Sequence, residues 1–238
     1  MNFTEALEQA AREYGLSLTP KQLSDFTVYY ELLIEWNEKM NLTAITDPQE
    51  VAIKHVVDSL SCMDTEFLPE NCTLIDVGTG AGFPGFPIKI MRPDIRLTLL
   101  DSLNKRVSFL KEVGSRLDIQ DVNYIHGRAE EVARTKEHRE KYQVSSARAV
   151  ARLNILCELC IPFLSLNGCF IAPKGAQYQE ELNEAKNALS ILGAKAVKVA
   201  PVKLPVIEDI RAVIYIQKTK PTPQAYPRRP GIPEKKPL

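Results

Sequence analysis

The feature that most constrains this 238-residue chain is an apolar segment that runs directly into a glycine-rich turn, Leu74-Ile75-Asp76-Val77-Gly78-Thr79-Gly80-Ala81-Gly82-Phe83-Pro84-Gly85. Gly80, Gly82 and Gly85 match the spacing G-x-G-x-x-G, which joins a strand to a helix in nucleotide-binding α/β folds. The segment therefore predicts the first strand of a parallel sheet, with a ligand bound beyond the carboxyl end of that strand.

The rest of the chain supplies the strands and helices that such a sheet requires. We expect strands at Thr73–Val77, Arg96–Leu100, Val122–Ile125, Val144–Ala147 and Cys169–Ala172, with helical patterns such as Lys105–Leu117 and Ile155–Leu164 between them. Strands that alternate with helices form parallel sheets wound on both faces. The last two strands, Lys195–Val199 and Ala212–Gln217, are separated only by a loop with two prolines, so we expect antiparallel neighbours there. The predicted fold is an α/β doubly wound sheet, mostly parallel, with a C-terminal antiparallel strand, which resembles the Rossmann-like class I methyltransferases.

The two ends of the chain depart from this alternation. Thr19-Pro20-Lys21-Gln22 forms a capping-box pattern, and Asp47-Pro48-Gln49-Glu50 repeats the signal of a helix start. Residues 1–70 are therefore predicted to form an N-terminal helical cap, followed by the sheet domain at 71–218. Residues 219–238 are rich in proline and basic residues, and we expect neither a regular helix nor a central strand in this tail.

Composition excludes several other classes of protein. No apolar run approaches the roughly 20 residues that cross a bilayer, and the start lacks the features of a signal peptide. Five cysteines indicate free thiols in a reducing compartment, so we expect a cytoplasmic location and no membrane partner. Cys157 and Cys160 lack the second pair of ligands that a zinc site needs, which predicts no metal and two core thiols. Because the formal net charge is zero, an RNA partner requires basic groups gathered locally.

The glycine spacing alone leaves an NAD site open, and Asp76 argues against it. A carboxylate beside the turn would repel a pyrophosphate, whereas S-adenosylmethionine carries a cationic ammonium and a cationic sulfonium. Asp101 closes the second strand, where an acid can accept both ribose hydroxyls of an adenosyl group. We therefore expect S-adenosylmethionine as the cofactor. An NAD-dependent oxidoreductase and a non-catalytic RNA-binding module of the same fold remain alternatives.

Several sequence blocks in order resemble the bacterial ribosomal RNA small-subunit methyltransferase G family, also called glucose-inhibited division protein B. They are Glu35–Thr43, His55–Leu60, Asp76–Pro84, Leu100–Arg106, Gly127–Glu130, Ala147–Ala151 and Tyr226–Gly231. The resemblance implies methylation of guanine N7 in 16S ribosomal RNA, free or in the small subunit. Gln143 and the segment Pro205–Ala212 depart from the pattern of the family. From the turn chemistry and the resemblance together, the expected cofactor-binding residues are Asp76, Gly78, Gly80, Gly82, Phe83, Asp101, Ser102, Ala129, Glu130 and Arg148.

The implied reaction needs no general base, because guanine N7 has a free in-plane lone pair. We find neither the Asn-Pro-Pro-Tyr-like tetrad of enzymes that attack an exocyclic amine nor a catalytic cysteine. Arg148 is our candidate for the residue that bridges the cofactor and the target base, and so positions that base. Basic or polar residues near the same strand ends and in the tail are the candidate RNA contacts. They are His55, Arg152, Lys174, Arg228 and Arg229.

Overall fold

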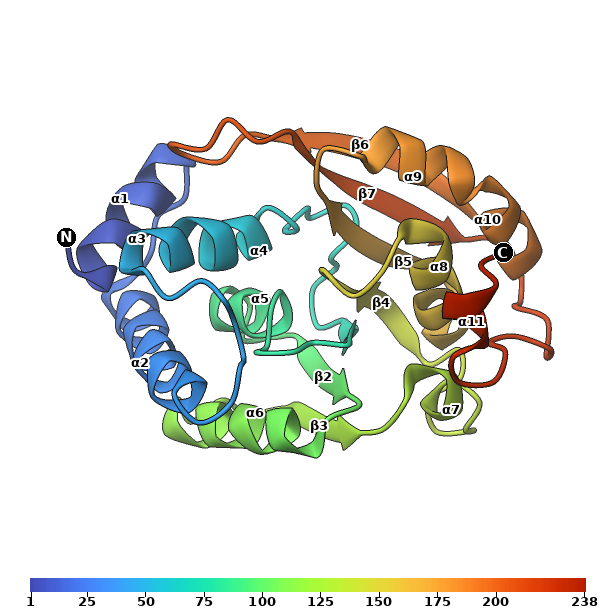
Figure 1. The fold of residues 1–238 in the computed structure, drawn as a ribbon, viewed down its shortest axis with the longest axis horizontal. Helices are drawn as coiled ribbons and strands as arrows, with labels where there is room; N and C mark the ends of the chain where they lie inside the picture. The colour runs from blue at the N-terminus through green and yellow to red at the C-terminus, as the bar shows by residue number, and fades with distance from the viewer.

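The computed structural model describes residues 1–238 and contains one seven-stranded sheet with helices on both faces (Figure 1). The strands are β1 (Thr73–Val77), β2 (Arg96–Asp101), β3 (Val122–His126), β4 (Tyr142–Ser146), β5 (Leu164–Lys174), β6 (Ala194–Val202) and β7 (Arg211–Lys218). Their order in the sheet is β3-β2-β1-β4-β5-β7-β6. Strands β1 to β5 pair in parallel, and β7 pairs antiparallel with both β5 and β6. The predicted fold class is confirmed.

The predicted boundaries were least accurate around β5. The helix expected at Ile155–Leu164 is α8 (Leu153–Cys160), followed by a single 3-10 turn at Ile161–Phe163. Pro162 lacks an N–H and cannot continue an α-helix. Strand β5 then begins at Leu164, five residues before the expected start at Cys169, because Leu164 pairs with Tyr142 across an irregular register.

Two buried clusters hold the sheet between its helices. The first packs α5 (Gly85–Met91) and α6 (Asn104–Arg116) on one face, and it continues without interruption into the N-terminal helices. The second packs α8 and α10 (Lys186–Leu192) on the opposite face. Two short helices, α7 (Ala129–Val132) and α9 (Tyr178–Glu184), complete this second side. The parallel strands therefore bury both faces, as their apolar sequences require.

The N-terminal cap consists of α1 (Phe3–Glu13), α2 (Pro20–Asn37) and a third helical segment. This segment runs through α3 (Pro48–Val51), a π-helical stretch at Ala52–Val57 and α4 (Asp58–Leu60). The capping box at Thr19 and the N-cap at Asp47 both form as predicted. Phe26 and Val57 are fully buried in the same cluster as Phe86 and Phe109, so cap and sheet share one core.

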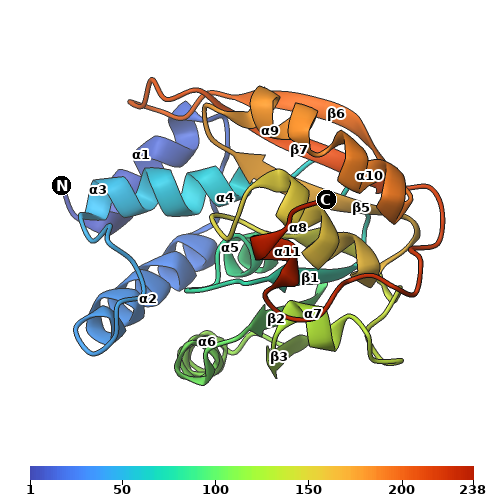
Figure 2. The same ribbon diagram turned by 45° about the vertical axis from the view of Figure 1, so that its right-hand side comes forward.

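The C-terminal tail, in red, folds back along the side of the molecule that lies away from the N-terminal cap (Figure 2). It contains one helical turn, α11 (Ile232–Lys235), which lies against α8, and no strand. Tyr226 and Leu238 pack on the second cluster. None of the helices has the length and apolar composition needed to cross a bilayer.

Candidate functional site

The glycine turn after β1 is organised by Asp76, which is fully buried. Its carboxylate accepts hydrogen bonds from Thr79 Oγ1 at 2.6 Å, from the Gly85 amide at 3.0 Å and from Ser146 Oγ at 3.0 Å. Burial raises the pKa of this carboxyl, and the three hydrogen bonds oppose that rise. From the sequence we expected Asp76 to stabilise a cationic cofactor, either directly or through water. In the structure its oxygens point into the turn, and it does not line the neighbouring cavity.

The Gly85 amide belongs to the first turn of α5, where a dinucleotide would place its pyrophosphate. The Gly85 amide already donates its hydrogen bond to Asp76, and Pro84 and Pro87 have no N–H to donate. The carboxylate therefore disfavours NAD in two ways: by its charge, and by using a donor that a phosphate would need.

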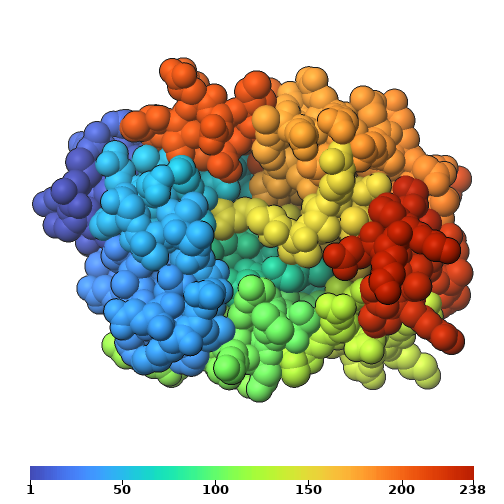
Figure 3. Space-filling model, in the orientation of Figure 1, coloured from blue at the N-terminus to red at the C-terminus, as the bar shows by residue number.

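A cavity of about 250 Å³ opens beyond the carboxyl ends of β1, β2 and β3. Five of the predicted cofactor residues line it, namely Gly78, Asp101, Ser102, Ala129 and Glu130. Figure 3 shows a hollow between the cap, in blue, and the tail, in red, with the yellow segment near residue 150 crossing it. We call the space on the β1–β3 side the first cavity.

Asp101 fixes the floor of the first cavity. It is almost fully buried, and its carboxylate accepts from the Gly80 amide and the Leu103 amide, each at 2.9 Å. Arg106 adds an ion pair at 3.5 Å. Each carboxylate oxygen can accept more than one hydrogen bond, so Asp101 retains capacity for a ligand diol. Gly80 contributes to the site by holding this acid, and it does not line the cavity itself.

Gly78, directly after β1, lines the first cavity. Its φ of +66° lies in the left-handed region, and a Cβ there would lie 2.8 Å from Val150 Cγ2. Glycine is therefore required at this position for both conformation and space. Val150 and Ala151 line this cavity and also a second one, so this short segment separates the two.

The second cavity has a volume of about 510 Å³ and lies between the cap and the ends of β4, β5 and β7. Basic side chains from distant parts of the sequence converge there. Its charged and histidine lining residues are Lys54, His55, Asp58, Arg148, Arg152, Lys174, Glu181 and Arg211. The structure thus brings together Arg148 and three of the predicted RNA-binding residues.

Asp58 holds two of the three arginines of this cavity. Its Oδ2 accepts from Arg148 at 2.8 Å, and its Oδ1 accepts from Arg211 at 3.0 Å. Arg148 also donates to the Lys54 carbonyl at 3.0 Å, which belongs to the π-helical stretch. A π-helix often marks a functional position, and here the carbonyl of one of its residues, Lys54, accepts the hydrogen bond of Arg148. The guanidinium of Arg148 lies 5.1 Å from the Phe83 ring centre.

His55 is the neutral member of this group. Its Nε2 lies 2.8 Å from Thr43 Oγ1, and its Nδ1 lies 3.5 Å from Arg148 Nη2. Arginine can only donate, so Nδ1 accepts and Nε2 carries the proton. Burial, and then the charge of Arg148, lower the pKa of His55 to about 4. Phe83 packs between this ring and Tyr29, with ring centres at 4.8 Å and 5.2 Å.

The two other predicted RNA contacts in the second cavity already have acidic partners. Lys174 pairs with Glu181 at 2.7 Å, and Arg152 bonds Glu184 at 2.9 Å and Glu180 at 3.0 Å. An RNA phosphate would have to compete with these carboxylates. The contact of Lys174 and Arg152 with RNA therefore stays a prediction.

Arg228, which we predicted as a candidate RNA contact, pairs with a buried acid of the protein, and its contact with RNA stays a prediction. Its guanidinium and amide donate to Glu158, a side chain 1% exposed, at distances from 2.6 to 3.1 Å. Arg229 is exposed and lies outside both cavities. Arg228 is therefore a structural anchor of the tail, and the tail segment next to it adds Pro233 and Glu234 to the lining of the first cavity.

Sequence reasoning missed residues whose partners are far away in the chain. Arg211 lies in a segment that we noted only as unusual, and Tyr29 donates from α2 to the Ala81 carbonyl in the glycine turn. No local pattern signals either contact. The core role predicted for Cys157 and Cys160 is confirmed, since both are free and buried, and burial raises the pKa of both thiols. No group of three or more His, Cys, Asp or Glu side chains is arranged to hold a metal ion.

Comparisons with known proteins agree with this geometry. A family model described as rRNA small subunit methyltransferase G matches residues 22–209. A ribosomal RNA small subunit methyltransferase G of Alkaliphilus metalliredigens is 50% identical over 98% of this chain and 97% of its own length. That of Bacillus subtilis is 45% identical over 100% of this chain and 99% of its own.

Solved structures show the same fold at low sequence identity. A SAM dependent methyltransferase from Aquifex aeolicus has a TM-score of 0.55 at 15% identity, covering 78% of this chain and 98% of that one. The [4+2]-cyclase SpnF has a TM-score of 0.56 at 12% identity, covering 85% of this chain and 97% of that one. Because proteins of one fold catalyse different reactions, these similarities show the fold of this chain and not its activity.

Proposed function

The chain belongs to the rRNA small subunit methyltransferase G family, and we propose on this basis that it transfers a methyl group from S-adenosylmethionine to guanine N7 in 16S ribosomal RNA. Family membership makes it a methyltransferase and replaces the alternatives of an NAD-dependent oxidoreductase and a silent RNA-binding module. The observation that carries the finer assignment is the pair of adjoining cavities that share one wall. One cavity suits a nucleoside and the other suits a base attached to a phosphate backbone.

The residues of the first cavity fit an adenosyl cofactor. Asp101 lies at the end of β2, where a carboxylate can accept two ribose hydroxyls, and Ser102 and Glu130 add further polar groups. The acidic side chains of this lining, Asp101, Glu130 and Glu234, outnumber its single basic one, Arg128. An acidic lining favours a cationic ligand over a pyrophosphate.

The second cavity is where we place the target guanine. Arginine donates two parallel hydrogen bonds to guanine O6 and N7 in the commonest specific contact with this base. Methylation requires N7 to be free, so an arginine here can address O6 or a neighbouring phosphate. Arg148 and Arg211 are already oriented by Asp58, which keeps both guanidinium groups at the wall of this cavity.

Bound S-adenosylmethionine supplies an electrophilic methyl group on its sulfonium. The chain has to align the base, exclude water and accept the positive charge that develops on the methylated guanine. Alignment can contribute up to about 7–11 kcal/mol in favourable reactions. Asp58 is a buried acid in the lining of the second cavity, and its charge opposes the local excess of arginine. His55, held neutral by its lowered pKa of about 4, adds no further cation.

The proposal is tested by methyl transfer from labelled S-adenosylmethionine to small ribosomal subunits and, separately, to naked 16S RNA. Wild-type protein should label one guanine that becomes sensitive to borohydride reduction and aniline cleavage, the reaction of N7-methylguanosine. Arg148→Ala should lower kcat/KM at least a hundredfold, and Arg148→Lys, which keeps the charge, should retain part of it. Label on an exocyclic nitrogen, or unchanged activity in both variants, would contradict the proposal.

We propose that the protein acts in the bacterial cytoplasm, because ribosomes are assembled there. We propose this location from the names of the relatives. The ribosomal RNA named for them is the partner that we propose for this chain.

A further inference from the structure

The C-terminal tail reaches the first cavity, and nothing in the sequence predicted this. The Gly231 amide donates to Glu130 Oε1 at 3.0 Å, and Pro233 and Glu234 line the cavity beside it. Glu130 is 7% exposed and lies in α7, directly after β3. No protein donor bonds the second oxygen of Glu130, which is therefore available to a ligand.

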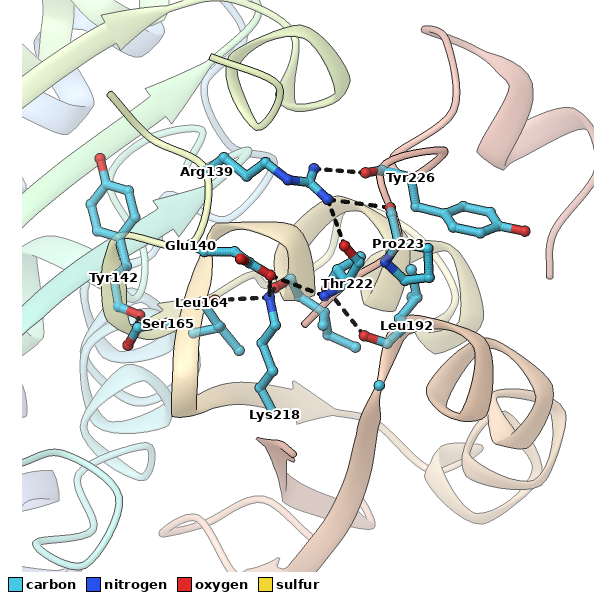
Figure 4. A network of polar contacts seen from close by, with 12 residues as sticks. Arg139, Glu140, Tyr142, Leu164, Ser165, Leu192, Lys218, Thr222, Pro223 and Tyr226 are labelled. Atoms are coloured by element: carbon cyan, nitrogen blue, oxygen red, sulfur yellow. Dashed lines mark hydrogen bonds and ion pairs between the residues drawn. The ribbon is translucent and has the colours of Figure 1, made fainter. Parts of the chain in front are cut away.

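A proline-rich segment needs hydrogen-bond donors from elsewhere to stay ordered, because it cannot form a helix or a ladder of its own. Arg139 donates to the Thr222, Pro223 and Tyr226 carbonyls at 2.8 to 3.2 Å, and Arg134 donates to the Ala225 and Pro227 carbonyls at 2.9 to 3.0 Å. Figure 4 shows Arg139 pointing into this bend of the tail. Two arginines thus hold the path of the tail.

An ion-pair group fixes the point where the tail leaves the sheet. Lys218, which is fully buried at the end of β7, donates to Glu140 at 2.7 Å and to the Leu164 carbonyl at 2.9 Å (Figure 4). Glu140 also accepts the Thr222 amide at 3.0 Å. Further along, the ion pair of Arg228 with Glu158 lies three residues before Gly231. The tail is therefore tied down on both sides of its bend before it reaches the first cavity.

Gly231 itself has a backbone conformation that favours glycine. Its φ is +79°, and no atom lies within 4 Å of the position a Cβ would take. A side chain would therefore be strained by the backbone alone and would meet no neighbour. The direction of the Gly231 amide, and with it the orientation of Glu130, depends on this conformation.

We propose that residues Gly231–Glu234 form a wall of the cofactor site and that the Gly231 amide positions Glu130 for the nucleoside of the methyl donor. The inference rests on the proposed function. It assigns the tail to cofactor binding, in place of the RNA contact that its basic composition suggested. Gly231 is a positioning residue, and Glu234 adds a carboxylate to a site that takes a cation.

The test compares three variants with the full-length wild-type protein by calorimetric titration with S-adenosylmethionine. The first ends at Gly231 and so lacks residues 232–238, the second is Gly231→Ala, and the third is the control Lys236→Ala, whose exposed side chain lies outside the cavity. We expect the dissociation constant to rise at least tenfold in the first and at least threefold in the second. The control should match the wild type.

Binding of naked 16S RNA, measured as a function of salt, separates the two roles of the tail. The proposal expects RNA affinity and its salt slope to stay within twofold in the shortened chain. A folded shortened chain and a folded Gly231→Ala variant that both bind the cofactor as the wild type does would overturn the inference. If the shortened chain fails to fold, Gly231→Ala decides alone. If the wild type does not bind S-adenosylmethionine, the proposed function itself fails, and that result is distinct.

Discussion

The N-terminal cap and the C-terminal tail both lie beside the cavities, yet they are attached to the sheet by opposite means. The cap has no core of its own and buries Phe26, Leu33 and Val57 in the cluster that also holds α5 and α6. The tail is held by hydrogen bonds from the domain in addition to the packing of Tyr226 and Leu238. Arg134 and Arg139 donate to its backbone carbonyls, and Glu158 accepts from Arg228. A segment with apolar periodicity is stabilised by burial, and a segment broken by prolines is stabilised by donors that the domain provides.

The largest effect should come from the core that cap and sheet share. Phe26 is fully buried there, so Phe26→Ala removes a large side chain from a close-packed site. We expect the free energy of unfolding to fall by about 4 kcal/mol. Denaturant unfolding at low and at high salt measures it, and the loss should be the same in both. A loss below about 1 kcal/mol would mean that the cap packs far more loosely than described.

The matching change in the tail is Glu158→Gln, which keeps the shape of the side chain and removes its charge. Hydrogen bonds to charged groups contribute about 1.5–3 kcal/mol, so we expect a loss of about 2 kcal/mol. Because Arg228 is partly exposed, this loss should shrink between low salt and 1 M salt. A salt-independent loss would remove the contrast between the two ends of the chain.

Acid should affect the cap through His55. The pKa of this side chain is about 4 in the folded chain, against 6.5 as the ordinary value. As pH falls between these values, the unfolded state binds a proton that the folded state does not, so stability is complete above 6.5 and declines below it. We expect wild-type stability to drop by about 2 kcal/mol from pH 7 to pH 5, relative to His55→Gln. Equal pH dependence in both proteins would show that another group is responsible.

How far the sequence predicted the structure follows from the range of each interaction. The strands and the glycine turn carry their signal in consecutive residues, and β1 was predicted to its last residue. The pairing of Asp58 with Arg211 joins residues 153 positions apart, and that of Glu158 with Arg228 spans 70. A basic residue looks the same in sequence whether it faces solvent or a buried acid. For this reason the sequence could not show that Arg228 pairs with Glu158, and the contact of the tail with RNA stays a prediction.

Asp76 illustrates the same limit within a motif that was identified correctly. Its position predicted a preference against pyrophosphate, but its hydrogen bonds to Thr79, Gly85 and Ser146 could not be read from the spacing. Ser146 is the last residue of β4, and only the sheet order brings β4 beside β1. Topology therefore decides which groups a motif residue meets.

Val150 and Ala151 line both cavities, so binding in one cavity can be coupled to binding in the other. A ligand that shifts these residues on one side alters the free energy of association on the other. By linkage, the influence is equal in both directions. Under the proposed function, we expect the affinity for RNA to depend on whether S-adenosylmethionine is bound.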